Sequence, residues 1–187
     1  MILYHGTDQR IDVIDLSKSR LRTDFGRGFY LSDRLGNART WAVDKSGNWG
    51  VPTVIRCYVD DAIWNDVGLQ HRKFDSPTAA WLNFVRDNRR RNSAGVSSNE
   101  PRHSFDIISG PIADDKVALA VDKYCRGLLT TEEAIEEIRI IKEVFQVSLH
   151  TPLALTYIRQ MLYSQRTNKR WSGWQETSSQ HPFLRLP

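Results

Sequence analysis

The sequence has very little cysteine and no long hydrophobic run, and each absence excludes a class of protein. Cys57 and Cys125 are the only cysteines in 187 residues, too few for a disulfide framework or a metal cluster. Each lies among apolar residues, as buried free thiols do. No apolar stretch approaches the roughly 18 residues of a membrane span, and Met1 is followed at once by Ile2 and Leu3, without the basic and apolar segments of a signal peptide. We therefore expect a cytoplasmic protein that binds no metal and has no membrane partner.

The charge balance is slightly basic and otherwise ordinary. The 26 Lys and Arg residues against 22 Asp and Glu give a formal net charge of +4, which mildly favours anionic partners without identifying one. Hydrophobic residues make up 40% and charged residues 26% of the chain, as in folded globular proteins. A length of 187 residues predicts one domain with a substantial core.

Hydrophobic periodicity predicts an alternation of short strands and helices. Residues 53–59 carry the strongest strand signal and are expected at the centre of a sheet. Thr130 followed by Glu133 is typical of a capping box at a helix start. The expected strands are residues 2–4, 28–31, 53–59, 105–108 and 145–149, with an extended piece at 13–16, and the expected helices are residues 34–43, 78–90, 113–126, 131–144 and 152–163.

Three further expectations concern strand ends and loops. Gly110 and Pro111 are expected to end the strand that precedes them. Strict alternation in residues 145–149 places Gln146 and Ser148 on a polar, solvent-facing side. Residues 92–103 are predicted to form a surface loop, and residues 165–187 are polar and basic with no assignment.

The glycine-rich stretch of residues 24–32 is the most informative part of the chain. Gly26 and Gly28 stand directly before an aromatic strand that contains Tyr30, and backbone of this kind bends tightly or comes close to a ligand. The His5-Gly6 pair ends a very short first strand, where a polar group can point into a cleft. We expect these two pieces to face each other across a nucleotide, although each residue alone is more typical of a structural role.

In this order, a short strand with His5-Gly6, a glycine-rich approach to Tyr30 and a late strand led by Gln146 resemble the ADP-ribosyltransferase fold, in the branch with a His, a Tyr and a third polar residue as its signature. Residues 3–7, 24–32, 41–42 and 105–115 look like a bacterial family within that fold, long known only as a domain of unknown function. That family is associated with toxin-type transferases that are often encoded beside a small antitoxin protein. The resemblance covers roughly residues 2–162. Within it, residues 62–103 are included only because of their position between matching segments.

The resemblance implies that NAD is bound as a substrate, without a metal. His5 would hydrogen-bond the adenosine ribose, the backbone of Gly6 would hold the nicotinamide amide, and Tyr30 would stack on the nicotinamide ring. Gly26 and Gly28 would let the chain approach the cofactor without a side chain in the way.

The same resemblance implies the remaining cofactor contacts. An arginine is expected at the pyrophosphate, and the sequence does not choose among three candidates. The implied cofactor-binding residues are Thr7, Phe29 and Ser32, with Arg20, Arg22 and Arg27 as the arginine candidates.

Gln146 occupies the third signature position, where a carboxylate is the commonest residue. A carboxylate there would grip a ribose hydroxyl and stabilise the positive charge that builds on the ribose as nicotinamide leaves. Gln146 can hydrogen-bond the ribose but supplies no negative charge. The sequence therefore does not identify the residue that would act as general base and remove a proton from the acceptor.

Three functions remain open from the sequence. The first is mono-ADP-ribosyl transfer to a protein or nucleic-acid target by a toxin that poisons or restrains its host cell. The second is NAD hydrolysis, with water as the acceptor. The third is a non-catalytic nucleotide- or nucleic-acid-binding module, for which residues 89–91 and Lys169-Arg170-Trp171 with Trp174 offer basic and aromatic groups.

The implied architecture is α+β. Two small, highly twisted β-sheets would form an NAD cleft surrounded by helices. Residues 1–163 would be a single ADP-ribosyltransferase-like domain with a family-specific insertion at 62–103, followed by a basic C-terminal tail at 164–187.

Overall fold

The computed structural model describes residues 1–89, 103–112, 115–139 and 144–177. These residues divide into two compact units, which we describe separately. The first unit contains Met1–Asp15, Phe29–Leu69 and the chain from Thr151 onward. The second unit contains Leu16–Gly28 and Gln70–His150.

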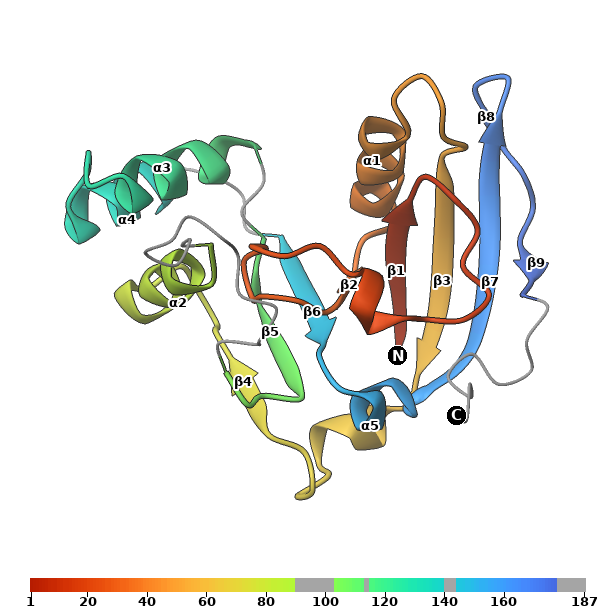
Figure 1. The fold of residues 1–187 in the computed structure, drawn as a ribbon, viewed down its shortest axis with the longest axis horizontal. Coiled ribbons are helices and arrows are strands. Elements are labelled where there is room, and N and C mark those ends of the chain that lie inside the picture. Colours follow the sequence, from red (N-terminus) through yellow and green to blue (C-terminus); the bar gives the residue numbers. More distant parts are fainter. Residues whose placement is uncertain (90–102, 113–114, 140–143, 178–187) are drawn as a thin grey trace. The chain divides into compact units, whose positions relative to one another are not determined.

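An antiparallel sheet forms the centre of the first unit (Figure 1). Strand β3 pairs with β1 on one side and with β7 on the other, so residues 53–59 do occupy an inner position, as predicted. Two short strands pair with β7. The strands of this unit are β1 (Ile2–Thr7), β2 (Phe29–Ser32), β3 (Thr53–Val59), β7 (Ile158–Thr167), β8 (Arg170–Trp171) and β9 (Gln175–Glu176).

Helix α1 (Leu35–Ser46) packs on one face of this sheet, against β1 and β3 (Figure 1). The contact is close at Gly6, where an added methyl group would overlap the carbonyl oxygen of Ala38 and lie 3.0 Å from the amide nitrogen of Ala42. Ala38, Ala42 and Val54 form a buried cluster at this point. Small residues on both elements therefore bring the helix axis close to the strand.

The opposite face of the sheet is also buried. His5 pairs with Ile55 and Gly6 with Val54 in the β1–β3 register, and successive strand residues point to opposite faces. His5 and Ile55 therefore lie on the face away from α1. Cys57 shares that face and is fully buried as a free thiol, as expected, while Cys125 in the second unit is partly exposed.

The second unit has a mixed three-stranded arrangement. Strand β4 pairs in parallel with β5, and β5 pairs antiparallel with β6. Helix α3 contacts α4, and α2 contacts both. The elements are β4 (His71–Lys73), α2 (Ala79–Arg89), β5 (Ile107–Pro111), α3 (Asp115–Cys125), α4 (Thr131–Arg139) and β6 (Phe145–Leu149).

Most predicted elements are confirmed, and the fold class is α+β. The described residues contain five α-helices, counting the short α5 (Pro152–Leu155) of the first unit, and a mixed sheet. The predicted capping box is present: the Thr130 amide donates to the Glu133 carboxylate at 2.8 Å, and the Glu133 amide donates to Thr130 Oγ1 at 3.2 Å. Residues 92–102 of the predicted loop, and the helix positions 113–114 and 140–143, lie outside the described residues.

Four predictions about elements are wrong. Residues 152–163 were expected to be one helix, but α5 ends at Leu155 and β7 follows. Because β7 pairs along β3, tertiary pairing outweighs the local helix signal there. Gly110 and Pro111 continue β5 instead of ending it, residues 13–16 contain no strand, and Gln146 and Ser148 are buried.

Gly6→Ala should destabilise the first unit by about 2–4 kcal/mol, because the new methyl group must displace helix backbone that cannot move cheaply. Urea unfolding followed by circular dichroism measures the change. Gly36→Ala in α1 is the matched control: nothing lies within 4 Å of the added methyl group, so this variant should be as stable as the parent or up to about 1 kcal/mol more stable. Equal stability of the two variants would contradict the close contact at Gly6.

Candidate functional site

His5 is the best-defined candidate residue of the first unit. Its Nδ1 lies 2.8 Å from the carbonyl oxygen of Tyr30, and a carbonyl only accepts, so Nδ1 carries the proton and donates. The ring stacks on Phe29, with centroids 4.5 Å apart. No partner of Nε2 is found among the described residues, which leaves one acceptor position on an oriented imidazole.

The surroundings keep this imidazole neutral. Burial lowers the pKa of His5 from 6.5 to about 4, against the opposing effect of the Tyr30 carbonyl, and Lys45 lowers it further. At neutral pH Nε2 therefore presents a lone pair to a hydroxyl or amide donor.

Strand β2 supplies the neighbours of His5. Tyr30 is half-buried, whereas Phe29 is 4% exposed and forms part of the core. The antiparallel pairing of β1 with β2 places Tyr4 opposite Ser32.

Thr7 and Ser32 are buried and make local contacts. The Thr7 hydroxyl donates to Asp8 at 3.3 Å, and Ser32 Oγ accepts from the Arg34 amide at 3.1 Å. The structure thus brings His5, Gly6, Thr7, Phe29, Tyr30 and Ser32 together in the first unit, while Arg20, Arg22, Gly28 and Gln146 belong to the second.

Gln146 lies beside a buried carboxylate in the second unit. Its Nε2 donates to Asp24 Oδ2 at 3.0 Å and to the Pro111 carbonyl at 3.3 Å. The Arg89 guanidinium donates to Asp24 Oδ1 through Nε at 3.0 Å and through Nη2. Asp24 and Gln146 are each 8% exposed. Both hydrogens of the Gln146 amide are therefore used inside the protein, and a ligand could reach only its Oε1 as an acceptor.

Two histidines hold the glycine-rich loop. His150 Nδ1 donates to the Arg27 carbonyl at 2.7 Å, and His103 Nε2 donates to the Phe25 carbonyl at 2.7 Å. Gly28 is required here, because an added methyl group would lie 2.8 Å from the His150 ring. The glycine at position 28 thus makes room for the His150 ring.

The three candidate arginines differ in their surroundings. Arg20 and Arg22 are exposed, and Arg22 has a left-handed backbone with φ of 57°. Arg27 is partly buried, and its Nε is shielded from solvent with no hydrogen-bond partner in the described part of the chain. A shielded guanidinium donor without an acceptor is destabilising, so Arg27 is the candidate whose surroundings most favour an anionic ligand.

Sequence reasoning missed the residues that hold the site in place. Asp24 lies in the glycine-rich stretch without a predicted role, and Arg89 is predicted only as one of the basic residues 89–91. The signal available for Asp24 was its position directly before the buried Phe25. A carboxylate next to a core aromatic must be paired, but the sequence does not tell with what.

Within residues 1–89, 103–112, 115–139 and 144–177, no group of three or more His, Cys, Asp or Glu side chains is placed to hold a metal ion. None of the described helices is both long and apolar enough to cross a membrane.

These residues define an α+β protein with an oriented, neutral histidine on a strand pair and a buried Asp–Gln–Arg cluster in its second unit. Residues 1–160 match the model of a family described as "Protein of unknown function (DUF3990)". The match spans most of the chain, which therefore belongs to this family. No curated protein matches the chain. No solved structure matches it either.

Acid should destabilise the protein between about pH 6.5 and pH 4. Burial lowers the pKa of both His5 and His150 to about 4, so below pH 6.5 the unfolded chain binds protons that the folded chain does not. Their stabilising effect is complete above pH 6.5 and is lost as the pH falls towards 4, at about 1.4 kcal/mol per pH unit and per histidine. Urea midpoints measured from pH 7.5 to pH 4.5 report this slope.

His150→Asn should flatten that pH dependence in part, because His5 and His103, whose pKa values burial also lowers, remain. A parent protein that is equally stable at pH 7.5 and pH 5 would show that these histidines are not held neutral.

Gln146→Glu should lower the free energy of unfolding at pH 7 by about 1–3 kcal/mol. The new carboxylate would face Asp24 at about the 3.0 Å that now separates donor and acceptor. Repulsion raises the pKa of the introduced group, so the loss should shrink as the pH falls and that group binds a proton. Denaturant unfolding at pH 7 and pH 5 measures both effects. Gln175→Glu, at an exposed position in β9, is the matched control, and an equal effect there would contradict the Asp24 contact.

Proposed function

We propose that this chain is an NAD-dependent mono-ADP-ribosyltransferase that acts in the cytoplasm on a macromolecular target. The observation that carries the proposal is the state of His5, a neutral ring fixed by the Tyr30 carbonyl with Nε2 as an acceptor. NAD offers ribose hydroxyls, which are donors that suit this nitrogen. In the reaction the bond between nicotinamide and ribose C1′ breaks, nicotinamide leaves with the electron pair, and an acceptor atom bonds to C1′ and loses its proton.

The nicotinamide end fits the strand pair beside His5. A carboxamide needs one donor and one acceptor in fixed geometry, and the backbone of Gly6 would supply them. Half-buried Tyr30 can offer a ring face to the flat nicotinamide. Gly6 has a structural role as well, since α1 packs against it, and the two roles use different sides of the strand.

The resemblance implies that Gln146 acts on a ribose hydroxyl, and its contacts within the second unit limit how it could do so. Since both amide hydrogens are engaged, it would act only by accepting through Oε1. The negative charge of Asp24 beside it is partly balanced by Arg89. This arrangement stabilises developing positive charge less than a free carboxylate would.

The engagement of Asp24 also favours a second candidate, NAD hydrolysis. A carboxylate that is bound by Arg89 and Gln146 is poorly suited to remove a proton from a protein or nucleic-acid acceptor. Water, present at high concentration, needs less activation once C1′ carries positive charge.

Purified protein incubated with adenylate-labelled NAD and a cell lysate should transfer label to a macromolecule. Tyr30→Ala should lower the rate about 5- to 150-fold, since a lost stacking contact costs roughly 1–3 kcal/mol, and His5→Ala should also lower it. Tyr58→Ala on β3 and His71→Ala on β4 are the matched controls. Nuclease or protease treatment of the labelled product shows whether the acceptor is nucleic acid or protein. Toxicity is tested by the growth of cells that express the chain, with and without a small antitoxin protein encoded beside it.

The outcomes separate the candidates. If free ADP-ribose accumulates and no macromolecule is labelled, the activity is NAD hydrolysis and not transfer. Absence of both products and of nicotinamide release, or equal rates in Tyr30→Ala and the parent, would overturn the proposal.

A further inference from the structure

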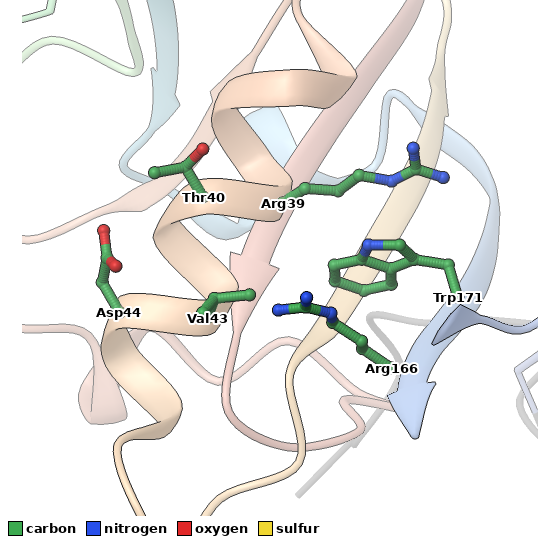
Figure 2. A pocket seen from close by; sticks show the side chains of 6 residues that line it. All are labelled: Arg39, Thr40, Val43, Asp44, Arg166 and Trp171. Carbon is green, nitrogen blue, oxygen red and sulfur yellow. The ribbon is translucent and has the colours of Figure 1, made fainter. Parts of the chain in front are cut away.

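A shallow, open hollow lies beside α1 in the first unit. Its volume is about 300 Å³. Figure 2 shows it between α1 and strands β7 and β8. Its lining residues are Arg39, Thr40, Val43 and Asp44 from α1, Arg166 from β7 and Trp171 from β8.

Two arginines flank one indole in this hollow. Arg166 and Trp171 are paired across β7 and β8, and the guanidinium carbon of Arg39 lies 5.2 Å from the centre of the Trp171 ring. In Figure 2 the indole lies between the two arginine side chains. The hollow therefore combines a flat aromatic surface with two cations.

Neither arginine has an anionic partner among the described residues, and the Nε of each is shielded from solvent without an acceptor. Two other arginines of this unit are paired with carboxylates: Arg10 with Asp12 at 2.7 Å and Arg159 with Asp60 at 2.8 Å. Shielded donors without acceptors cost free energy, which an anionic ligand would recover. Guanidinium groups bind phosphate in the bidentate manner that this requires.

A second pair of the same kind lies nearby. The guanidinium of Arg56 lies 3.9 Å from the centre of the Trp174 ring. Trp171 and Trp174 both pack against the cluster formed by Ala38, Ala42 and Val54. Repeated arginine–tryptophan pairs match a ligand in which phosphates and flat bases alternate.

We propose that this hollow binds single-stranded nucleic acid: Arg39 moves off the face of Trp171 to hold a phosphate, one base takes its place on the indole, and Arg166 holds a second phosphate. The exposed Asp44 carboxylate on the rim can accept from an exocyclic amine of a base. Exposed Lys169 in the turn between β7 and β8 and exposed Arg170 at the start of β8 add positive charge for the continuing backbone.

This site is separate from the residues proposed to bind NAD. Ser164 pairs with Val54, on the α1 face, and Arg166 lies two residues further along β7 on that same face. His5 pairs with Ile55 on the other face. Binding at the hollow therefore requires neither NAD nor the proposed transferase activity, and its failure can be told apart from theirs.

Fluorescence anisotropy with labelled 12-nucleotide single strands, DNA and RNA of one mixed sequence, tests the proposal on the full chain without NAD. Trp171→Ala should weaken binding about 5- to 100-fold, while Trp171→Phe should retain most of it. Arg39→Gln with Arg166→Gln should weaken binding and lower the slope of log K against log salt by about 1.4, near 0.7 for each lost phosphate contact.

Matched controls are Trp49→Ala, at a tryptophan that is 98% exposed, and Arg159→Gln, whose side chain is 61% exposed on β7. Both should bind like the parent, and thermal unfolding should show that all variants are folded. Three results would overturn the proposal. The first is that neither the DNA nor the RNA strand binds at about 50 mM salt, where electrostatic binding to nucleic acid is strong. The others are that folded Trp171→Ala binds like the parent, or that a blunt duplex binds as tightly as the single strands.

Discussion

The close approach of α1 to β1 at Gly6 is the contact on which the first unit most depends. Only a residue without a side chain leaves room for the helix backbone of Ala38 and Ala42. That approach buries Val54 and covers one face of the sheet, while His5 occupies the other face. The same helix then carries Arg39 to Trp171. A single steric constraint thus supports both sites that we propose in this unit.

The second unit is organised around a buried charge instead. Asp24 is balanced by Arg89 from α2 and receives a hydrogen bond from Gln146 in β6. Removing any one partner would leave a buried polar group unpaired, which costs more than the pair contributes. His103 and His150 donate hydrogen bonds to the carbonyl groups of Phe25 and Arg27. The glycine-rich loop is therefore fixed by side chains that come from far along the chain.

Local signals were sufficient where neighbouring residues decide the structure. The capping box of Thr130 and Glu133 and the β-branched strand at residues 53–59 depend on short-range geometry, and both are present. The prediction for residues 152–163 failed because β7 gains its hydrogen bonds from β3, about a hundred residues earlier. Gln146 and Ser148 look solvent-facing by alternation alone, yet Gln146 finds its acceptor 122 residues away, in Asp24.

The sequence by itself determined which residue types are available: the His5-Gly6 strand, the glycine-rich approach to Tyr30, the absence of a carboxylate at position 146 and the resemblance that these carry. Only the tertiary structure decided their states. It orients the His5 ring against the Tyr30 carbonyl, engages Gln146 with Asp24, and sets Arg39 and Arg166 around Trp171 without an anion among the described residues. The physical reason is that protonation, burial and hydrogen-bond pairing depend on atoms brought together in space, and periodicity along the chain does not encode those distances.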